Sequence, residues 1–329
     1  MKLLVYAGIM DALATYLKTL GHPDRLRILA LLSQSELTVS ELVQILDLSQ
    51  PRITQYIKSL EQIGVVERMR EGSWVFSRLK RGQESNSVIL AATLSALSHD
   101  HPQLQSDREV LNQVRAERSR QAEAFFASVA NDHNQLGHEY LPQADIEESL
   151  LELVGSQKFN RMVDLGTGTG RMLKLFAPLI RSGVGVDDSV DMLRVARHTL
   201  SDDAYTHISV QQADLQDAPL KDEAADLVTL HQVLHFLEDP GKAVAEAARL
   251  LDDGGHLLIT DFGKHMLENY RESYSHRRLG FSDTDMSQFL EQNGFKLTQK
   301  RSLPASDPLT PDVKIWHAIK IPAARAAIG

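Results

Sequence analysis

Apolar residues recur along the first third of the chain with helical spacing. Leucines and isoleucines return there every three or four residues, the period of helices that bury one face. The helices predicted in this way cover residues 11–20, 22–33 and 49–60. A further short helix is predicted from Thr38, because Glu41 three residues later completes a capping box. Residues 65–68 and 74–79 are predicted as two strands joined by a basic-tipped turn.

Beyond about residue 145, predicted helices and strands alternate. The predicted helices are 144–155, 170–181, 189–200, 240–251 and 283–293, and the predicted strands are 160–165, 183–187, 207–211, 225–230, 254–261, 295–302 and 313–319. Such alternation predicts a mostly parallel sheet with helices on both faces, where ligands bind at the carboxyl ends of the strands. Between the two regions, residues 103–139 are charged and carry only a thin apolar stripe, which favours a solvated helical connector or a dimer strut.

The length of 329 residues exceeds what one hydrophobic core usually supports, so a multidomain chain is expected. The predicted order is an α+β winged helix-turn-helix domain over 1–100, a helical linker over 101–143, and an α/β Rossmann-like domain over 144–321. The tail after Ile321 is expected to be disordered. No apolar run is long enough to cross a bilayer and no signal-peptide pattern opens the chain, so we expect a cytoplasmic protein without membrane contact.

Charge and cysteine content narrow the possible partners. Net charge is −9, but residues 1–82 hold 11 lysines and arginines against 8 aspartates and glutamates, a balance of +3. The remaining residues hold 24 against 36, a balance of −12. The positive share therefore lies where phosphate contacts would need it. The absence of cysteine excludes disulfides, thiolate metal sites and cysteine nucleophiles.

The segment 49–60 has the pattern of a DNA-reading helix. Ser49 and Pro51 favour a helix start, and Ile53, Ile57 and Leu60 form the buried stripe. Polar side chains on the other face suit base edges and phosphates in a major groove. The expected DNA-contacting residues are Gln50, Arg52, Thr54, Gln55, Tyr56 and Lys58 on the helix, and Arg68, Arg70 and Arg78 on the hairpin. The alternative is a winged-helix domain used only for protein contacts.

Three motifs in this region resemble the ArsR-type winged helix-turn-helix family. They are residues 22–29 for the second helix, 48–51 entering the reading helix, and 70–79 for the wing. The resemblance implies a homodimer on an inverted-repeat operator in double-stranded DNA, with the dimer contact made by the first helix and one after the wing. Leu90, Leu94 and Leu97 are candidates for the latter.

No metal site is predicted. Where thiol-based metal sensors of that family carry Cys-x-Cys, this chain has Thr38, Val39 and Ser40. His99, Asp100 and His101 hold nitrogen and oxygen ligands that zinc accepts, but adjacent ligands without further partners favour a polar loop.

A glycine-rich loop follows the strand at 160–165. Its glycines are spaced Gly-x-Gly-x-Gly, tighter than the dinucleotide pattern, and the preceding Asp164 would repel a phosphate but can accept from an ammonium group or its solvent shell. Asp187 ends the next strand, where an acidic residue can accept both ribose hydroxyls. Asp214 after the third strand can accept an adenine amino group, and Leu215 can pack on the ring.

These elements resemble the class I S-adenosylmethionine-dependent methyltransferases, and the resemblance covers residues 160–261. It implies the class I methyltransferase fold and a site for S-adenosylmethionine or S-adenosylhomocysteine. The residues expected to hold this ligand are Asp164, Gly166, Thr167, Gly168, Gly170, Asp187, Asp188, Met192, Asp214, Leu215 and His231. A site for a different nucleotide is the alternative.

Catalysis is a separate matter from ligand binding. His231 and His235 lie one turn apart beyond the fourth strand, and either one can serve as a general base. The pattern favours a capping histidine and a packing histidine instead. His276, Arg277 and Arg278 are predicted as solvated surface, with anion binding as the alternative.

The whole chain resembles fused ArsR-type and methyltransferase regulators of proteobacteria. That resemblance implies a transcriptional regulator of methionine-cycle genes, with S-adenosylhomocysteine or S-adenosylmethionine as effector. The alternative is an active small-molecule methyltransferase with an N-terminal dimerisation or autoregulatory domain, and no residue pattern identifies its methyl acceptor.

Overall fold

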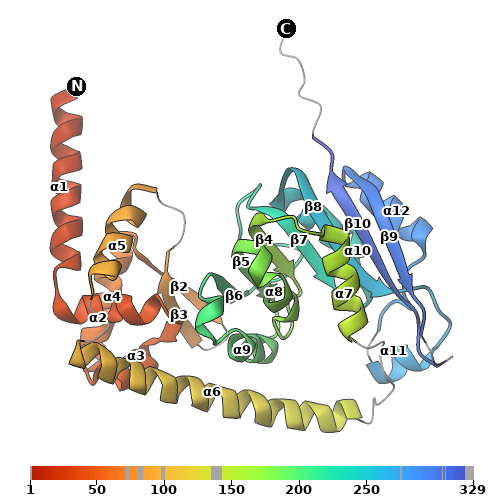
Figure 1. The fold of residues 1–329 in the computed structure, drawn as a ribbon, viewed down its shortest axis with the longest axis horizontal. Helices are drawn as coiled ribbons and strands as arrows, with labels where there is room; N and C mark the ends of the chain where they lie inside the picture. Colours follow the sequence, from red (N-terminus) through yellow and green to blue (C-terminus); the bar gives the residue numbers. More distant parts are fainter. Residues whose placement is uncertain are drawn as a thin grey trace. The chain divides into compact units, whose positions relative to one another are not determined.

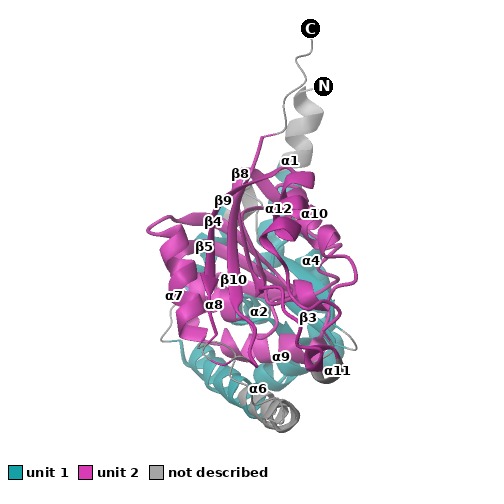
Figure 2. Cartoon of the chain, turned by 90° about the vertical axis from the view of Figure 1, so that its right-hand side faces the viewer, with its two compact units in different colours: residues 1–121 teal, residues 122–329 magenta. Residues whose placement is uncertain are grey.

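The computed structural model describes residues 2–71, 74–80, 84–97, 101–134, 143–274, 276–305, 307 and 309–322. The chain divides into two compact units, residues 1–121 and 122–329 (Figures 1 and 2). The first unit holds helices and a three-stranded sheet, and the second holds a seven-stranded sheet. Together they confirm the predicted order of a small α+β region followed by an α/β sheet. The wing tip, the His99–Asp100 pair and the end of the tail lie outside the described residues.

Helices make up most of the first unit. They are α1 (Lys2–Leu20), α2 (Pro23–Leu32), α3 (Val39–Leu46), α4 (Gln50–Gln62), α5 (Glu84–Ala96) and α6 (Pro102–Asn134), and the strands are β1 (Leu37–Thr38), β2 (Val66–Glu71) and β3 (Trp74–Leu79). The strands form an antiparallel sheet in the order β1-β3-β2. The α3–α4 pair and the β2–β3 hairpin match the predicted helix-turn-helix and wing.

Local chemistry defines the turn between α3 and α4. Thr38 and Glu41 form the predicted capping box at the start of α3. Asp47 is the C-cap of α3. Its N–H still donates to the carbonyl of Val43, but its backbone is in the left-handed region at φ +53°, so the helix does not continue beyond it. Pro51 in the first turn then starts α4, since its missing N–H is not needed there. Ile53, among the stripe residues of α4, is fully buried.

The first half of α6 belongs to the core of the first unit, so the predicted solvated connector is wrong for residues 102–118. Leu111 is 0% exposed and Val114 is 5% exposed, and both join the apolar cluster of the helix-turn-helix. Arg118 binds both carboxylate oxygens of Glu41 at 2.8 and 2.7 Å. The apolar stripe is thin because charged pairs supply part of the contact. The predicted boundaries at residues 100 and 143 remain a prediction.

The second unit alternates strands and helices. Its strands are β4 (Phe159–Leu165), β5 (Ile180–Asp187), β6 (Ile208–Gln212), β7 (Ala225–His231), β8 (Leu251–Phe262), β9 (Phe295–Leu303) and β10 (Val313–Lys320), and its helices are α7 (Gln143–Val154), α8 (Arg171–Phe176), α9 (Val190–Thr199), α10 (Pro240–Leu250), α11 (Asn269–Tyr274) and α12 (Asp283–Gln292). The sheet order is β6-β5-β4-β7-β8-β10-β9. The first five strands in this order are parallel, and β10 is antiparallel to both of its neighbours.

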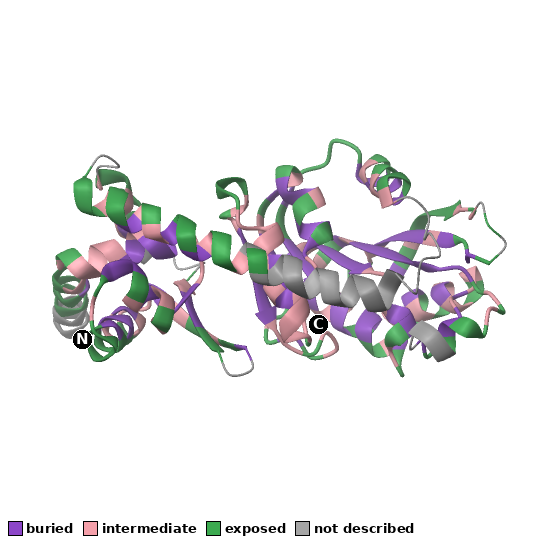
Figure 3. Cartoon of the chain, turned by 90° about the horizontal axis from the view of Figure 1, so that it is seen from below, coloured by how far each residue is buried: buried purple, intermediate pink, exposed green. Residues whose placement is uncertain are grey.

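Helices cover both faces of this sheet, as predicted. Met162 of β4 packs in one apolar cluster with residues of α7, α8 and α9, and its neighbour Val163 packs in the other with residues of α10 and α12. Figure 3 shows the buried residues following the strands. The strands after β4 are added first on one side of it (β5, β6) and then on the other (β7, β8). The strand order therefore reverses between β4 and β7, and a crevice is expected at the carboxyl ends of these two strands.

Three predicted boundaries in this unit differ from the structure by three residues or more, and one of them is the start of β8, at Leu251 instead of residue 254. Helix α8 ends at Phe176 instead of residue 181, and β5 starts at Ile180 instead of residue 183. Pro178 lies in a short 3-10 turn between them, because its ring is not compatible with the interior of an α-helix. Among the helices of the described residues, none combines the length and the hydropathy that a membrane span requires.

Replacing Leu111 with alanine tests the packing of α6. Because Leu111 is fully buried, we expect Leu111→Ala to lower the free energy of unfolding of the first unit by about 2–5 kcal/mol. Hydrogen exchange of the amides in α2 and α4 measures this free energy. The matched control on the same helix is Gln113→Ala, at an exposed position, where we expect a change of at most about 0.5 kcal/mol. Equal, small effects of the two substitutions would mean that α6 does not support the unit.

Candidate ligand site and candidate DNA-binding surface

The glycine loop after β4 is bound to the end of β5. The backbone N–H groups of Gly166 and Thr167 both donate to the carbonyl of Val186, at 2.8 and 2.9 Å. The three glycines have φ angles of +74°, +50° and +78°, a region that disfavours other residues. The sequence therefore needs glycine here for backbone conformation, whatever the loop binds.

The glycines differ in what surrounds them. A Cβ added to Gly166 would lie 2.5 Å from the Val233 side chain, and one added to Gly170 would lie 3.2 Å from Ala196. At Gly168 an added Cβ would meet no protein atom within 4 Å. Gly166 and Gly170 thus allow close packing inside the unit, whereas Gly168 faces open space at the sheet edge where ligands bind in folds of this kind.

Asp164 holds the loop from inside the protein. Its side chain is fully buried, and its two oxygens accept hydrogen bonds from the hydroxyls of Thr167, at 2.6 Å, and Thr229, at 2.5 Å. Burial raises the pKa of Asp164 to about 6, although the two hydroxyls oppose this shift. The structure therefore gives Asp164 a role within the loop that the sequence did not predict.

Asp187 joins the loop to α9. One of its oxygens accepts from the backbone N–H of Gly168 at 2.8 Å, and the other accepts from the N–H of Ser189 at 2.9 Å. Burial raises its pKa, and these backbone donors oppose the shift. A carboxylate oxygen has two acceptor positions, so each oxygen keeps one position for a further donor.

The other predicted ligand residues lie near the same edge of the sheet. Asp188 and Asp214 are exposed, whereas Met192 and Leu215 are half-buried. The N–H of Ala213 donates to the Asp187 carbonyl at 3.0 Å, which holds the ends of β5 and β6 together. The structure thus brings the residues after β4, β5 and β6 to one edge, as the sequence predicts for a parallel sheet.

His231 and His235 occupy different surroundings. His231 ends β7, its Nδ1 is buried, and burial lowers its pKa to about 4. His235 is 2% exposed, and its Nδ1 lies 2.7 Å from an oxygen of Asp261, which is fully buried at the end of β8. Sequence reasoning missed Asp261. The available signal was a carboxylate at the end of an apolar strand, next to the expected ligand edge.

The segment after β8 folds over this pair, and the predicted solvated position of His276 is wrong. His276 is 3% exposed, and its ring centroid lies 4.1 Å from that of His235. Burial lowers the pKa of His276 to about 3. The backbone N–H groups of Arg277 and Arg278 both donate to the His235 carbonyl, which draws the segment inward while those two side chains stay exposed.

Helix α4 presents a polar face to solvent. The predicted residues Gln50, Arg52, Thr54, Gln55 and Lys58 are all exposed, and Pro51 and Gln62 of the same helix are exposed as well. Tyr56 does not lie on this face. It is 9% exposed and packs in the apolar cluster of the unit, while its hydroxyl donates to Asp24 at 3.1 Å and accepts from Arg52 at 2.8 Å. The helical period places Tyr56 three residues after Ile53, on the buried side.

The three predicted wing arginines are not equivalent. Arg70 and Arg68 are both exposed, and Arg68 donates to Glu61 at 2.7 Å. The Arg78 side chain is 14% exposed and pairs with Glu67 at 2.6 Å and with Glu36 at 3.5 Å. Arg78 is therefore the least available of the three for a phosphate, since its charge is already compensated.

Comparison with known proteins matches two stretches of the chain. Residues 22–68 match the family model described as bacterial regulatory protein, arsR family. Residues 163–259 match the model described as methyltransferase domain. Both resemblances predicted from the motifs are confirmed for these stretches.

Individual relatives align with part of the chain. The uncharacterized methyltransferase YcgJ of Bacillus subtilis (strain 168) is 30% identical over 102 residues, which cover 31% of this chain and 40% of that protein. The ubiquinone/menaquinone biosynthesis C-methyltransferase UbiE of Vibrio parahaemolyticus is 30% identical over 128 residues, covering 38% of this chain and 49% of that protein. The chain thus spans less than half the length of these two relatives.

Solved structures resemble about half of the chain. The crystal structure of YcgJ from Bacillus subtilis aligns with a TM-score of 0.47 and 21% identity. The aligned part is 54% of this chain and 98% of the YcgJ chain. The N-methyltransferase NodS from Bradyrhizobium japonicum WM9 has a TM-score of 0.46 and 17% identity, covering 54% of this chain and 96% of that one.

The raised pKa of Asp164 predicts a pH dependence of stability. Because the folded state holds the proton up to about pH 6 and the unfolded state loses it near pH 4, Asp164 makes the second unit less stable as pH rises from 4 to 6. The difference between 3.8 and about 6 corresponds to about 3 kcal/mol at most. We expect Asp164→Asn to remove this loss, so its stability relative to wild type should rise across that range in urea unfolding. Parallel pH curves for the two proteins would contradict the assignment.

Proposed function

We propose that this chain, which joins a helix-turn-helix region of the arsR family to a methyltransferase domain, is a DNA-binding transcriptional regulator with a small-molecule effector. The effector is S-adenosylhomocysteine or S-adenosylmethionine, and methionine-cycle genes are the targets. The observation that carries the proposal is the hydrogen bond from the Gly168 N–H to Asp187, which holds the glycine loop at the end of β5, in a chain that also has an exposed polar face on α4. We place the protein in the cytoplasm.

The residues at the sheet edge fit an adenosyl ligand. Asp187 keeps one acceptor position on each oxygen for the two ribose hydroxyls, and the open space above Gly168 admits the ligand close to the backbone. Leu215 offers an apolar surface to the adenine, and Asp214 an acceptor for its amino group. The remaining proposed ligand residues are Asp164, Gly166, Thr167, Gly170, Asp188, Met192 and His231.

The proposed DNA contact is made by the exposed face of α4. Gln50, Arg52 and Gln55 have side chains suited to base edges, and Lys58 adds a positive charge for phosphate. Arg70 and Arg68 on the wing supply further charge. Since phosphate neutralisation dominates such binding, the affinity should fall steeply with salt concentration.

We propose that the DNA-binding form is a homodimer on an inverted repeat. Helix α1 exposes Met10 (68%), Leu13 (40%) and Leu17 (50%) at positions that share one helix face, and α5 exposes Val88 (68%). Leu90 is not available for such a contact, because it is 8% exposed and packs in the core of its own unit.

The second candidate function is small-molecule methyl transfer, and the His235–Asp261 pair favours it. A buried aspartate beside Nδ1 holds the imidazole in one tautomer and leaves Nε2 as the acceptor, the arrangement of a general base. In that case the first unit serves as a dimerisation or autoregulatory domain. Methyl transfer to an acceptor, together with a DNA affinity that is the same with and without the ligand, would favour this function.

The regulator predicts DNA affinity that depends on the ligand. We expect S-adenosylhomocysteine or S-adenosylmethionine to change the affinity of the full chain for its own upstream region or for methionine-cycle promoters by about fivefold or more. Gly168→Val should abolish this response, because its side chain fills the ligand space, while DNA binding without ligand is retained. Fluorescence anisotropy measures both.

The control for Gly168→Val is Gly155→Val. Gly155 has φ +58° and likewise no protein atom within 4 Å of an added Cβ, but it follows α7 instead of the glycine loop. This variant should keep the ligand response. If neither ligand alters DNA binding by the wild-type chain, the regulatory role is wrong.

A further inference from the structure

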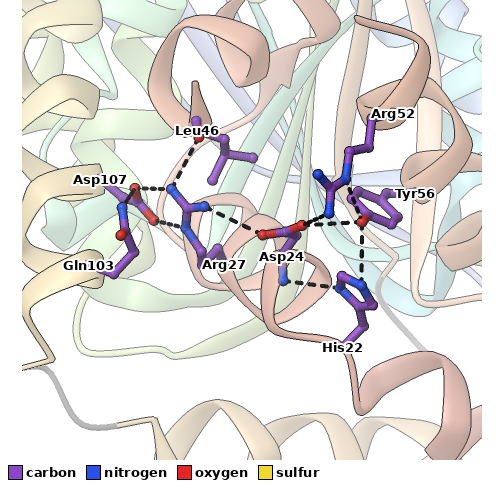
Figure 4. Close-up of polar contacts among 8 residues, drawn as sticks. All are labelled: His22, Asp24, Arg27, Leu46, Arg52, Tyr56, Gln103 and Asp107. Atoms are coloured by element: carbon purple, nitrogen blue, oxygen red, sulfur yellow. Dashed lines mark hydrogen bonds and ion pairs between the residues drawn. The ribbon is translucent and has the colours of Figure 1, made fainter. Parts of the chain in front are cut away.

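A chain of charged side chains links α6 to the exposed face of α4. Its members are Asp107 of α6, Arg27 and Asp24 of α2, and Arg52 of α4, and we call these four residues the Arg52 relay (Figure 4). They come from three helices and from positions up to 83 residues apart, so the relay exists only in the folded unit.

The α6 end of the relay is largely buried. Both guanidinium nitrogens Nε and Nη2 of Arg27 donate to the two oxygens of Asp107, each at 2.7 Å, and Asp107 is 2% exposed. Nη2 of Arg27 also lies 3.3 Å from the carbonyl of Leu46, the last residue of α3. A two-point contact of this kind determines the orientation of both planar groups as well as their distance.

Asp24 is the middle of the relay. One of its oxygens lies 3.5 Å from Nη1 of Arg27, and the other lies 2.9 Å from Nη2 of Arg52. That second oxygen also accepts from the Tyr56 hydroxyl at 3.1 Å. His22 stands beside the pair, since its Nδ1 accepts from the N–H of Asp24 and its Nε2 lies 3.4 Å from the Tyr56 oxygen.

Arg52 is held at one side and open at the other. Its Nε donates to the Tyr56 hydroxyl at 2.8 Å, and its Nη2 meets Asp24, so two anchors restrict a side chain that is still 51% exposed. These contacts leave Nη1 and the outer hydrogen of Nη2 for a further acceptor. A guanidinium that is already ordered loses less conformational freedom when it binds a base or a phosphate.

We infer that Asp24 and Asp107 are positioning residues for DNA contact by Arg52. Through them, α6 helps to hold Arg52 in the orientation in which α4, the proposed recognition helix, contacts DNA. This inference rests on the proposed function, because it assumes that Arg52 meets DNA. It also gives α6 a specific role: this helix crosses the division between the units at residue 121, and one end of the relay is part of it.

The sign of one substitution separates positioning from plain electrostatics. Asp24→Asn removes a negative charge beside the DNA face, and charge alone would then make DNA binding tighter. Loss of positioning makes it weaker. We expect about tenfold weaker binding, the scale of one hydrogen bond to a charged group.

The experiment is a double-mutant cycle on the full chain. The probe is the duplex that the wild-type protein selects from a random-sequence pool, and the measurement is its dissociation constant at fixed salt. Asp24→Asn and Asp107→Asn should each weaken binding in the wild-type background and change it by less than about twofold when Arg52→Ala is already present, since coupled residues do not add. Glu117→Gln removes the same charge from α6 at an exposed site, and it should leave binding unchanged.

Folding is checked separately by the melting temperature and the circular dichroism of each variant. Should Asp24→Asn or Asp107→Asn not fold, Tyr56→Phe replaces it in the cycle, because it removes one anchor of Arg52 by deleting a single oxygen. Equal losses with and without Arg52→Ala, or tighter binding by Asp24→Asn, would overturn the inference while leaving DNA binding intact. Failure of the proposed function looks different: the wild-type chain selects no duplex, or Arg52→Ala binds it as well as wild type does.

Discussion

The buried ion pair between Arg27 and Asp107 is the contact on which the behaviour of the first unit depends. Removing Arg27 would leave the carboxylate of Asp107, which is 2% exposed, without its ion-pair partner, and this costs about 3–5 kcal/mol. Separating the two charges without opening the core is therefore unfavourable, and the first half of α6 must move together with α2. The bidentate pair of Arg118 with Glu41 adds a second constraint, because Glu41 also caps α3. Helix α6 is thus bound to α2 and α3, the two helices immediately before α4.

A comparable constraint organises the second unit. Asp187 accepts from the backbone on both sides, Gly168 in the loop and Ser189 at the start of α9, and Asp164 holds the same loop through Thr167. The two carboxylates keep the loop in a conformation that only glycines adopt easily. A ligand then meets a loop that is already formed. Because pre-organisation lowers the entropy that binding must overcome, a small polar molecule can bind here without folding the site first.

Features that depend on neighbours in sequence were predictable. Three such features occur as expected: the capping box of Thr38 and Glu41, the proline start of α4, and the glycine loop. Each of them is formed by residues only a few positions apart. The parallel sheet followed from alternation, and the edge where Asp187 lies followed from the sheet. The exposed polar face of α4 was also predicted correctly, because it is the side opposite its apolar stripe.

The residues that sequence reasoning misplaced depend on partners far along the chain. From its sequence neighbours alone, Asp107 is expected to be a surface charge. It is buried because it pairs with Arg27, which lies 80 residues earlier. His276 was likewise expected in a solvated segment, but it is buried against the ring of His235. In both cases the polarity of the residue was visible, but its burial is decided by tertiary contacts that no local period contains. The thin stripe of α6 misled for the same reason.

We propose that a ligand at the glycine loop changes DNA contact by α4, and that the first half of α6, which packs in the core of the first unit, takes part in this change. Native-state hydrogen exchange of the full chain, with and without S-adenosylhomocysteine, tests it directly. We expect altered exchange in three places: the glycine loop at residues 166–170 with the end of β5 at Asp187, residues 102–118 of α6, and residues 50–62 of α4. Ligand-dependent changes confined to the second unit would contradict it.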